Sequence, residues 1–372
     1  MENMKKLGFG CMRLPMIGGA EGRVDIEHFR DMVDMYMAAG FRYFDTAHVY
    51  IGGQSETALR EALVERYPRD SFILTNKLSG SCYPREADIL PLFQTQLDAC
   101  GVEYFDYYLL HALSEEVYQH VTRCRSFDVV RRLRDEGRIR HIGISFHDKP
   151  ALLERILTEH PEIEAVQIQL NYVDIDSPVV QSGEVYDVCT RFHKPVIVME
   201  PVKGGALASL SSAASKPLEA LNGGSPANYA LRYAASFENV RVVLSGMSTR
   251  EQMAENLRSM ANFQPLAERE RAAIDSVRSI IRGENAIACT ACRYCVPGCP
   301  MDIPIPDLIS CLNAVRRYKD WPSSYYYTVA VQGRGRASQC VQCGQCARIC
   351  PQHLPIPSLM TEIAEALEPQ TK

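Results

Sequence analysis

Short apolar segments alternate with longer amphipathic segments along residues 1–280. The short segments are rich in β-branched and aromatic residues and predict buried strands, whereas the longer ones repeat apolar residues at helical spacing. One amphipathic segment covers residues 25–40 and ends in a glycine, a common helix terminator. Its apolar residues share one helical face: Phe29, Met32, Val33 and Tyr36. The alternation predicts βα units around a parallel sheet.

The number of predicted strands decides between two α/β architectures. Eight βα units in a chain of this length favour a closed (β/α)8 TIM barrel over an open doubly wound sheet. The predicted strands are Gly8–Arg13, Tyr43–Asp45, Phe72–Lys77, Tyr107–His111, Ile142–Ser145, Ala165–Gln169, Val196–Glu200 and Val242–Gly246.

The pattern changes near residue 283, where cysteines, prolines and short helical segments replace the βα alternation. We therefore predict two domains, a barrel over residues 1–282 and a smaller, mainly α-helical domain over residues 283–372. In the second domain CPMDIPIP at 299–306 is echoed by CPQHLPIP at 350–357, which indicates a duplicated unit. A helix is predicted between the two copies, at 306–320.

Composition and charge narrow the class of protein. Of the 372 residues, 46% are hydrophobic and 23% are charged, as in ordinary globular proteins. The net charge of -5 gives no general attraction to nucleic acid or to an anionic membrane. The opening MENMKKLGFG is followed by no apolar stretch, and no apolar run is long enough to span a bilayer. We expect a cytoplasmic protein.

Eight of the fourteen cysteines lie in two runs, CTACRYCVPGCP at 289–300 and CVQCGQCARICP at 340–351. Each run spaces its cysteines as CxxCxxCxxxC and ends in proline, which is the bacterial ferredoxin signature for a [4Fe–4S] cluster. A zinc ribbon needs only two CxxC pairs and gives no role to the third and fourth cysteines of each run. The spacing therefore predicts two [4Fe–4S] clusters and a ferredoxin-like domain.

The ligands of each predicted cluster come from both runs, because the fourth cysteine of a run in two-cluster ferredoxins binds the other cluster. Two clusters favour electron transfer, although clusters can also staple a domain that is too small to build its own core. The first predicted set is Cys289, Cys292, Cys295 and Cys350, and the second is Cys340, Cys343, Cys346 and Cys299.

A basic stretch lies between the two cysteine runs, with a single acid, Asp320. It offers either a balance for the negative charge of the clusters or a docking face for an acidic electron carrier, such as a ferredoxin or a flavodoxin. An ordinary solvated basic surface explains it equally well. Its cations are Arg316, Arg317, Lys319, Arg334 and Arg336.

Three consecutive predicted strands end in residues that can do chemistry, namely Asp45 with Tyr50 in the loop after it, then Lys77, then His111. In a (β/α)8 barrel these strand ends share one face, where active sites form. Reduction of a carbonyl by hydride leaves an alkoxide that needs a proton, which Tyr50 can donate. We expect the Lys77 ammonium to lower the pKa of Tyr50, Asp45 to hold Lys77, and His111 to orient the carbonyl oxygen. A single tyrosine, lysine or aspartate at a strand end is usually a packing or solvated residue, so the prediction depends on the four residues together.

Residues 1–280 resemble the aldo-keto reductase family. The four residues fall on that family's catalytic tetrad, and FDTAHVYIGGQSE at 44–56 resembles the segment after its second strand. The whole chain resembles the subgroup with a C-terminal ferredoxin-like domain that carries two [4Fe–4S] clusters. Further matching segments are GIS at 143–145, VQIQLNY at 166–172, MEPVKGG at 199–205 and SGMSTREQMAENL at 245–257.

The resemblance implies a nicotinamide cofactor, NADP(H) or NAD(H), at the barrel mouth. Ser145 and Gln167 match positions that hold the nicotinamide amide, and Glu255 and Asn256 match positions that contact adenine. The MEPVKGG stretch serves a nicotinamide pyrophosphate or a flavin phosphate equally well. The remaining cofactor-binding candidates in these segments are Glu200, Val202, Lys203, Gly204, Ser245, Gly246, Met247 and Arg250.

Four positions depart from the family pattern at the cofactor site. Gly246 and Gln252 stand where many relatives carry the lysine and the arginine that hold the 2′-phosphate of NADP, and only Arg250 remains nearby. Phe146 replaces an asparagine that helps to bind the amide, and Met199 replaces a tyrosine that stacks on the nicotinamide. Loss of bidentate or stacking contacts weakens cofactor binding, so the sequence does not decide between NADP and NAD.

The predicted function combines two kinds of electron transfer. A hydride carries two electrons together and a [4Fe–4S] cluster passes them singly, so a flavin (FMN), or a substrate that accepts single electrons, has to divide the pair. We predict an oxidoreductase that reduces a carbonyl or conjugated carbonyl compound, or oxidises the alcohol, with hydride transfer coupled to electron transfer through the clusters. The alternative is an electron-transfer adaptor whose barrel binds a partner or a small molecule without catalysis. The complete tetrad argues against the adaptor.

Overall fold

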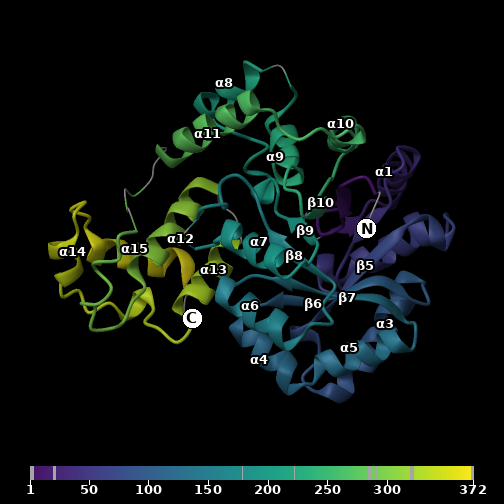
Figure 1. Ribbon diagram of the computed structural model, residues 1–372, viewed down its shortest axis with the longest axis horizontal. Coiled ribbons are helices and arrows are strands. Elements are labelled where there is room, and N and C mark those ends of the chain that lie inside the picture. Colours follow the sequence, from purple (N-terminus) through teal and green to yellow (C-terminus); the bar gives the residue numbers. More distant parts are fainter. Residues whose placement is uncertain are drawn as a thin grey trace.

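Eight parallel strands close a barrel in the computed structural model, which describes residues 4–19, 22–177, 179–221, 223–283, 287, 289, 291–318 and 322–369 (Figure 1). The order around the barrel is β1-β10-β9-β8-β7-β6-β5-β4. The predicted (β/α)8 fold is thereby confirmed. The barrel strands are β1 (Leu7–Gly10), β4 (Tyr43–Asp45), β5 (Ile73–Ser79), β6 (Phe105–Leu113), β7 (Ile139–Phe146), β8 (Ala165–Gln169), β9 (Val196–Met199) and β10 (Val240–Ser245).

Helices surround the barrel, and the first of them follows the predicted pattern. The Asp25 side chain caps α1 by accepting a hydrogen bond from the His28 amide, and the four predicted apolar residues of α1 are buried. Gly40 follows the helix with a φ of +78°, a conformation that glycine adopts without strain. The helices of this part are α1 (Ile26–Ala38), α2 (Gln54–Leu59), α3 (Ile89–Cys100), α4 (Glu115–Arg123), α5 (Ser126–Asp135), α6 (Pro150–Glu159), α7 (Ser182–Arg191), α8 (Ser212–Glu219), α9 (Pro226–Ala235), α10 (Arg250–Ala261) and α11 (Glu268–Gly283).

The ends of several strands differ from the prediction. The first strand stops at Gly10 rather than Arg13, because the chain turns at Cys11, whose amide donates to the Asp45 carbonyl of β4. A short antiparallel hairpin that was not predicted, β2 (Met16–Ile17) with β3 (Arg23–Val24), follows this turn. Strand β6 extends to Leu113 because it continues to pair with β7 beyond His111.

The second domain has its own apolar core, in which Leu308, Ile309 and Leu312 pack with Met360 and Ile363. Its helices are α12 (Ile305–Tyr318), α13 (Pro322–Val331), α14 (Gln345–Ile349) and α15 (Ile356–Leu367). Helix α12 matches the predicted helix, except that residues 319 and 320 lie outside the described residues, and α13 was not predicted.

The two parts are in contact. Val179 and Val180, from the loop after β8, belong to the apolar core of the second domain. Figure 1 shows α13 between the barrel and the remaining helices of that domain. The predicted boundary after residue 282 falls at the end of α11 and remains our interpretation. Within the described ranges no helix has both the length and the apolar composition needed to cross a bilayer.

Candidate functional site

Lys77 lies at the centre of the predicted tetrad. Its ammonium donates hydrogen bonds to Asp45 Oδ1 at 2.5 Å, to the Thr46 carbonyl at 2.8 Å and to the Tyr50 hydroxyl at 3.1 Å. Asp45 and Lys77 are both buried, at the ends of the neighbouring strands β4 and β5. All three donor protons of the ammonium therefore have a partner, which holds it beside the phenol.

Asp45 accepts hydrogen bonds at both of its carboxylate oxygens. The second oxygen accepts from the Gln167 side chain of β8 at 2.9 Å, so this predicted amide-binding residue lies in the same site. Tyr50 begins a tight loop in which Ile51, Gly52 and Gly53 all have positive φ. The two glycines adopt this conformation readily, and the loop turns Tyr50 toward Lys77.

His111 also reaches this site. Its ring lies edge-on to the Tyr50 ring, with the centroids 5.9 Å apart. Its Nδ1 is hydrogen-bonded to the Ser79 hydroxyl at 2.6 Å. Burial, together with the positive charge of Lys77, lowers the pKa of His111 well below its ordinary value. The imidazole is therefore neutral at physiological pH and can act as a hydrogen-bond donor rather than as an acid.

The pKa of Tyr50 corrects one expectation from the sequence. Burial raises it above its ordinary value, and this effect outweighs the lowering by Lys77. The pKa of Lys77 is raised as well, because Asp45 and Tyr50 overcome the lowering caused by burial. The resting pair is thus a neutral phenol beside an ammonium. Lys77 stabilises the phenolate after proton transfer instead of making Tyr50 acidic beforehand.

A cavity of about 650 Å³ opens beside this group and is lined by His111, Ser79 and Val49. Its lining also includes the polar side chains of Glu116, His120 and Arg123. Hydride acceptors of moderate size fit such a cavity.

Two groups of cofactor candidates come together in the structure. Ser145, on β7, accepts a hydrogen bond from the Ala112 amide at 2.7 Å and so lies next to His111. Asn256, on α10, donates to the Ser245 hydroxyl at the end of β10 at 3.0 Å. These two groups lie at strand ends of the same barrel face, as a cofactor bound across the mouth requires.

Three other candidates have side chains engaged elsewhere. The Lys203 ammonium is paired with the buried carboxylate of Asp174, at 2.9 and 3.1 Å, and also lines the cavity between the two parts of the chain. The Met247 side chain is fully buried in the barrel core. Arg250 forms an exposed ion pair with Asp31.

The remaining cofactor candidates differ in backbone conformation and in exposure. Glu200 and Gly204 both have positive φ, with values of +55° and +65°. A non-glycine residue in this conformation is strained and is found disproportionately where backbone groups meet a ligand. Val202 packs partly against the barrel core, Gly246 lies beside Arg13, and Glu255 is partly exposed on α10.

The eight cysteines of the two runs surround two cavities. Each cavity is lined by the first three cysteines of one run and the fourth cysteine of the other, which is the exchange predicted from the spacing. Among the described residues, no group of three or more ligating side chains is close enough to bind a single metal ion. Four cysteines around each cavity match the four irons of a [4Fe–4S] cluster, each of which takes one thiolate ligand. The two sets are Cys289, Cys292, Cys295 and Cys350, and Cys340, Cys343, Cys346 and Cys299.

The backbone repeats the duplication seen in the sequence. Ala291 and Gln342, each two residues after the first cysteine of its run, have φ values of +55° each. Asp302 and His353, each three residues after the fourth cysteine, have φ values of +50° and +53°. Turns of this kind present successive amide groups to one side and suit the sulfurs of an anionic cluster.

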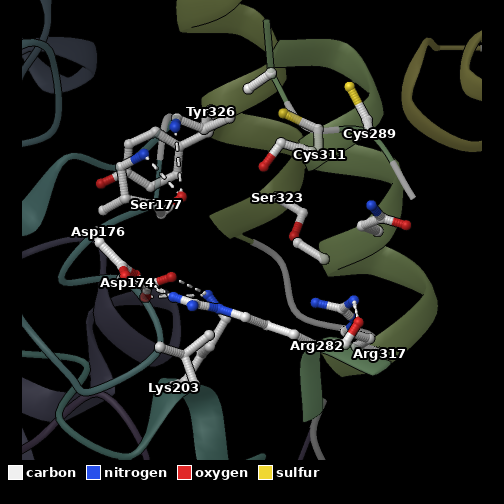
Figure 2. A pocket seen from close by; sticks show the side chains of 17 residues that line it. Asp174, Asp176, Ser177, Lys203, Arg282, Cys289, Cys311, Arg317, Ser323 and Tyr326 are labelled. Atoms are coloured by element: carbon white, nitrogen blue, oxygen red, sulfur yellow. Dashed lines mark hydrogen bonds and ion pairs between the residues drawn. The ribbon is translucent and has the colours of Figure 1, made fainter. Parts of the chain in front are cut away.

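A further cavity, of about 480 Å³, lies between the two parts of the chain (Figure 2). Asp174, Ser177 and Lys203 line it from the barrel loops, and Cys289 and Tyr326 line it from the second domain. It therefore joins a barrel loop predicted to hold a cofactor to a cysteine of the first predicted cluster.

The predicted basic stretch is partly neutralised. Arg316 pairs with Glu362, and Arg334 pairs with Asp302. Lys319 and Asp320 lie outside the described residues. Paired cations bind an acidic partner less strongly, so the docking-face hypothesis loses part of its basis.

Two groups at the site were missed in the sequence. Ser79 follows Lys77 by two residues on β5. Because side chains two residues apart on a strand point to the same side, this spacing would have identified Ser79 as a residue of the site. Tyr325 of α13 donates a hydrogen bond to the Ala112 carbonyl at 3.1 Å, next to His111. No sequence pattern signals a contact between two domains.

A closed barrel with a tyrosine, lysine, aspartate and histidine at its mouth is the arrangement of an oxidoreductase. The Aldo/keto reductase family model matches residues 6–279, and the chain belongs to this family. A 4Fe-4S dicluster domain matches residues 288–354. Both parts of the predicted subgroup are thus confirmed.

Individual relatives agree with this assignment. An aldo-keto reductase of Mycobacterium avium (strain 104) is 26% identical over 246 residues, which cover 66% of this chain and 80% of the relative. A thermostable aldo-keto reductase in complex with the inhibitor epalrestat has a TM-score of 0.58 at 25% identity, over 73% of this chain and 94% of that one. An aldo-keto reductase from Klebsiella pneumoniae in complex with NADPH has a TM-score of 0.58 at 18% identity, over 74% and 91%, and shows the fold alone.

Proposed function

We propose that the protein reduces a carbonyl or conjugated carbonyl compound at the barrel mouth, or oxidises the corresponding alcohol, and couples this reaction to two [4Fe–4S] clusters. The observation that carries the proposal is the position of the Lys77 ammonium, 3.1 Å from the Tyr50 hydroxyl and 2.5 Å from Asp45. A bound nicotinamide supplies the hydride, and the clusters exchange single electrons.

Each tetrad residue has a separate task in this reaction. Neutral His111 donates a hydrogen bond to the carbonyl oxygen and so stabilises the charge that develops there. Tyr50 donates its proton to the resulting alkoxide, and the adjacent Lys77 stabilises the phenolate. Asp45 holds Lys77 in place. The cavity lined by His111 and Ser79 accommodates the substrate.

The cofactor would be a nicotinamide, which Ser145 and Gln167 would hold at its amide and Ser245 and Asn256 would hold at its adenosine end. Choice between NADP(H) and NAD(H) depends on cations at the mouth. Arg250 is already paired with Asp31, so its attraction for a 2′-phosphate is reduced. We therefore propose weak discrimination between the two nicotinamides.

The two parts of the chain communicate across the cavity between them. Because Lys203 and Cys289 both line it, this cavity is where a flavin (FMN) or a substrate that accepts single electrons would divide the electron pair. One cysteine of each set, Cys292 and Cys343, is exposed, so both clusters have an edge from which a ferredoxin or flavodoxin takes or delivers electrons.

Anaerobic titration tests the coupling. The protein is purified without oxygen, its iron, sulfide and flavin are measured, and NADPH or NADH is added while cluster absorbance is followed. The proposal predicts binding of a nicotinamide and reduction of the clusters. Failure of every hydride donor to bind or to reduce the clusters would instead support the adaptor that binds without catalysis.

A further inference from the structure

The backbone next to His111 has an irregular conformation. On the paired strands β6 and β7, Leu110 faces Ile144 and Leu113 faces Phe146, so β6 contains one additional residue between these pairs. A bulge of this kind re-aims a side chain and interrupts the ladder of backbone hydrogen bonds. Ala112, in the bulge, has a φ of +57°, which a residue with a Cβ adopts only under strain. The bulge therefore sets the direction of His111 but has to be held by other contacts.

Two hydrogen bonds replace the lost ladder contacts of Ala112. Its amide donates to the Ser145 hydroxyl at 2.7 Å, within the barrel. Its carbonyl accepts from the Tyr325 hydroxyl at 3.1 Å, and Tyr325 belongs to α13 of the second domain. Backbone groups in such positions are nearly always paired, so Tyr325 supplies a partner that the barrel itself does not.

The Tyr325 ring is fixed against the same pair of strands. It packs edge-on against the ring of His147, just after β7, with the centroids 5.2 Å apart. The His147 amide donates to the Leu113 carbonyl at 3.0 Å, where β6 resumes after the bulge. Tyr325 also packs edge-on against its chain neighbour Tyr326, which lines the cavity shared with Cys289. One helix thus links the bulge to the predicted cluster region.

We propose that Tyr325 is a positioning residue for His111, so that the cluster-bearing domain completes the active site of the barrel. Tyr325 acts through the Ala112 carbonyl and fixes the direction of His111 and the Ser145 hydroxyl. The roles of His111 and Ser145 rest on the proposed function, whereas the contact between the domains does not. If the contact between the second domain and the barrel is loosened, His111 would lose its alignment with the carbonyl oxygen of the substrate.

The substitution Tyr325→Phe removes only the hydroxyl. Its matched control is Tyr327→Phe on the same helix, because the Tyr327 hydroxyl bonds Glu368 and the Ala337 amide inside the second domain and does not touch the barrel. Hydrogen exchange of the peptide covering residues 111–113 reports the bulge directly. Tyr325→Phe should speed this exchange about three- to tenfold, the effect of one lost neutral hydrogen bond, and Tyr327→Phe should not.

Kinetics distinguish positioning from a general loss of stability. With 4-nitrobenzaldehyde and NADPH as probes, Tyr325→Phe should lower kcat about three- to tenfold and leave the KM for the aldehyde within about a factor of two, because the lost alignment matters in the transition state. Equal exchange at 111–113 in the two variants would overturn the proposal. If the wild-type protein reduces no carbonyl with either nicotinamide, the proposed function fails, and the exchange measurement alone decides the contact between the domains.

Discussion

Lys77 and Asp45 form an ion pair with 2.5 Å between Nζ and Oδ1, at a place where neither side chain is exposed. Burial of two charges costs free energy that their mutual attraction only partly offsets. The pair is nevertheless completed by hydrogen bonds from Gln167 to Asp45 and from Lys77 to Tyr50. The ion pair lowers the stability of the fold, and its ammonium contacts the phenol of Tyr50. Both properties are understandable if the pair is part of an active site.

Removal of one charge should unfold the barrel more readily than removal of both. Lys77→Met leaves the Asp45 carboxylate buried without its partner, and we expect a loss of about 3–5 kcal/mol in the free energy of unfolding. The double variant Lys77→Met with Asp45→Asn should recover most of this loss but no activity. Urea unfolding measures the free energy of unfolding of both variants. The control is Arg85→Ala, at an exposed ion pair, which should change this free energy little. Full stability in Lys77→Met alone would contradict the described pair.

Acid should destabilise the folded protein through two histidines, buried His147 and half-buried His111. Burial lowers the pKa of His147 to about 4, and burial with the charge of Lys77 also lowers that of His111. Below about pH 6.5 the unfolded chain therefore binds protons that the folded chain does not. The free energy of unfolding should fall as the pH drops from about 6.5 toward 4, by about 1.4 kcal/mol per pH unit for each fully affected histidine. Urea unfolding between pH 7 and pH 5 measures the slope. His147→Asn should reduce it, whereas the exposed His193→Asn should not.

Exchange of the fourth cysteine between the clusters predicts which cluster each substitution damages. Cys350→Ser should disrupt the cluster of Cys289, Cys292 and Cys295, even though these lie in the other run. Iron content should fall by up to about half, and electron paramagnetic resonance of the reduced protein should lose the coupling between two clusters. Cys82→Ser, in the barrel, should leave both signals intact. Loss of the second cluster alone in Cys350→Ser would show that the ligands do not exchange.

A cation at position 252 should restore preference for NADP. Gln252 stands where many relatives carry an arginine, and its side chain accepts a hydrogen bond from the Ser248 amide at the start of α10. Gln252→Arg should strengthen NADPH binding about tenfold and leave NADH binding unchanged, since a charge-assisted contact acts only on the 2′-phosphate. Fluorescence titration with both nicotinamides measures this, with the exposed Gln264→Arg as control. Equal gains for the two cofactors would place the phosphate elsewhere.

The sequence was sufficient to predict the barrel and the meeting of its tetrad. Asp45, Lys77 and His111 end consecutive strands, and strand ends of a closed parallel barrel converge whatever the loops do. The pKa direction of Tyr50 was wrong because burial, which dominates it, depends on side chains far along the chain. The pairing of Lys203 with Asp174 was not predicted for a similar reason, since that carboxylate lies in another loop.

Contacts between the two domains were beyond prediction. The bulge at Ala112 depends on the register of two strands, and Tyr325 reaches it from a helix that shows no amphipathic pattern in the sequence. Spacing was informative for the cysteines because metal clusters impose short, regular intervals on the chain. Packing between distant surfaces imposes no such interval.

Proton donation by the Tyr50 phenol is the central claim, and the most direct measurement compares Tyr50→Phe with the wild-type protein in nicotinamide-dependent reduction of a panel of aldehydes and enones. Tyr104→Phe, near the start of β6 at the opposite end of the barrel, serves as the control. We predict that Tyr50→Phe abolishes turnover while nicotinamide binding and cluster absorbance stay unchanged. Turnover at the wild-type rate in this variant would contradict the account.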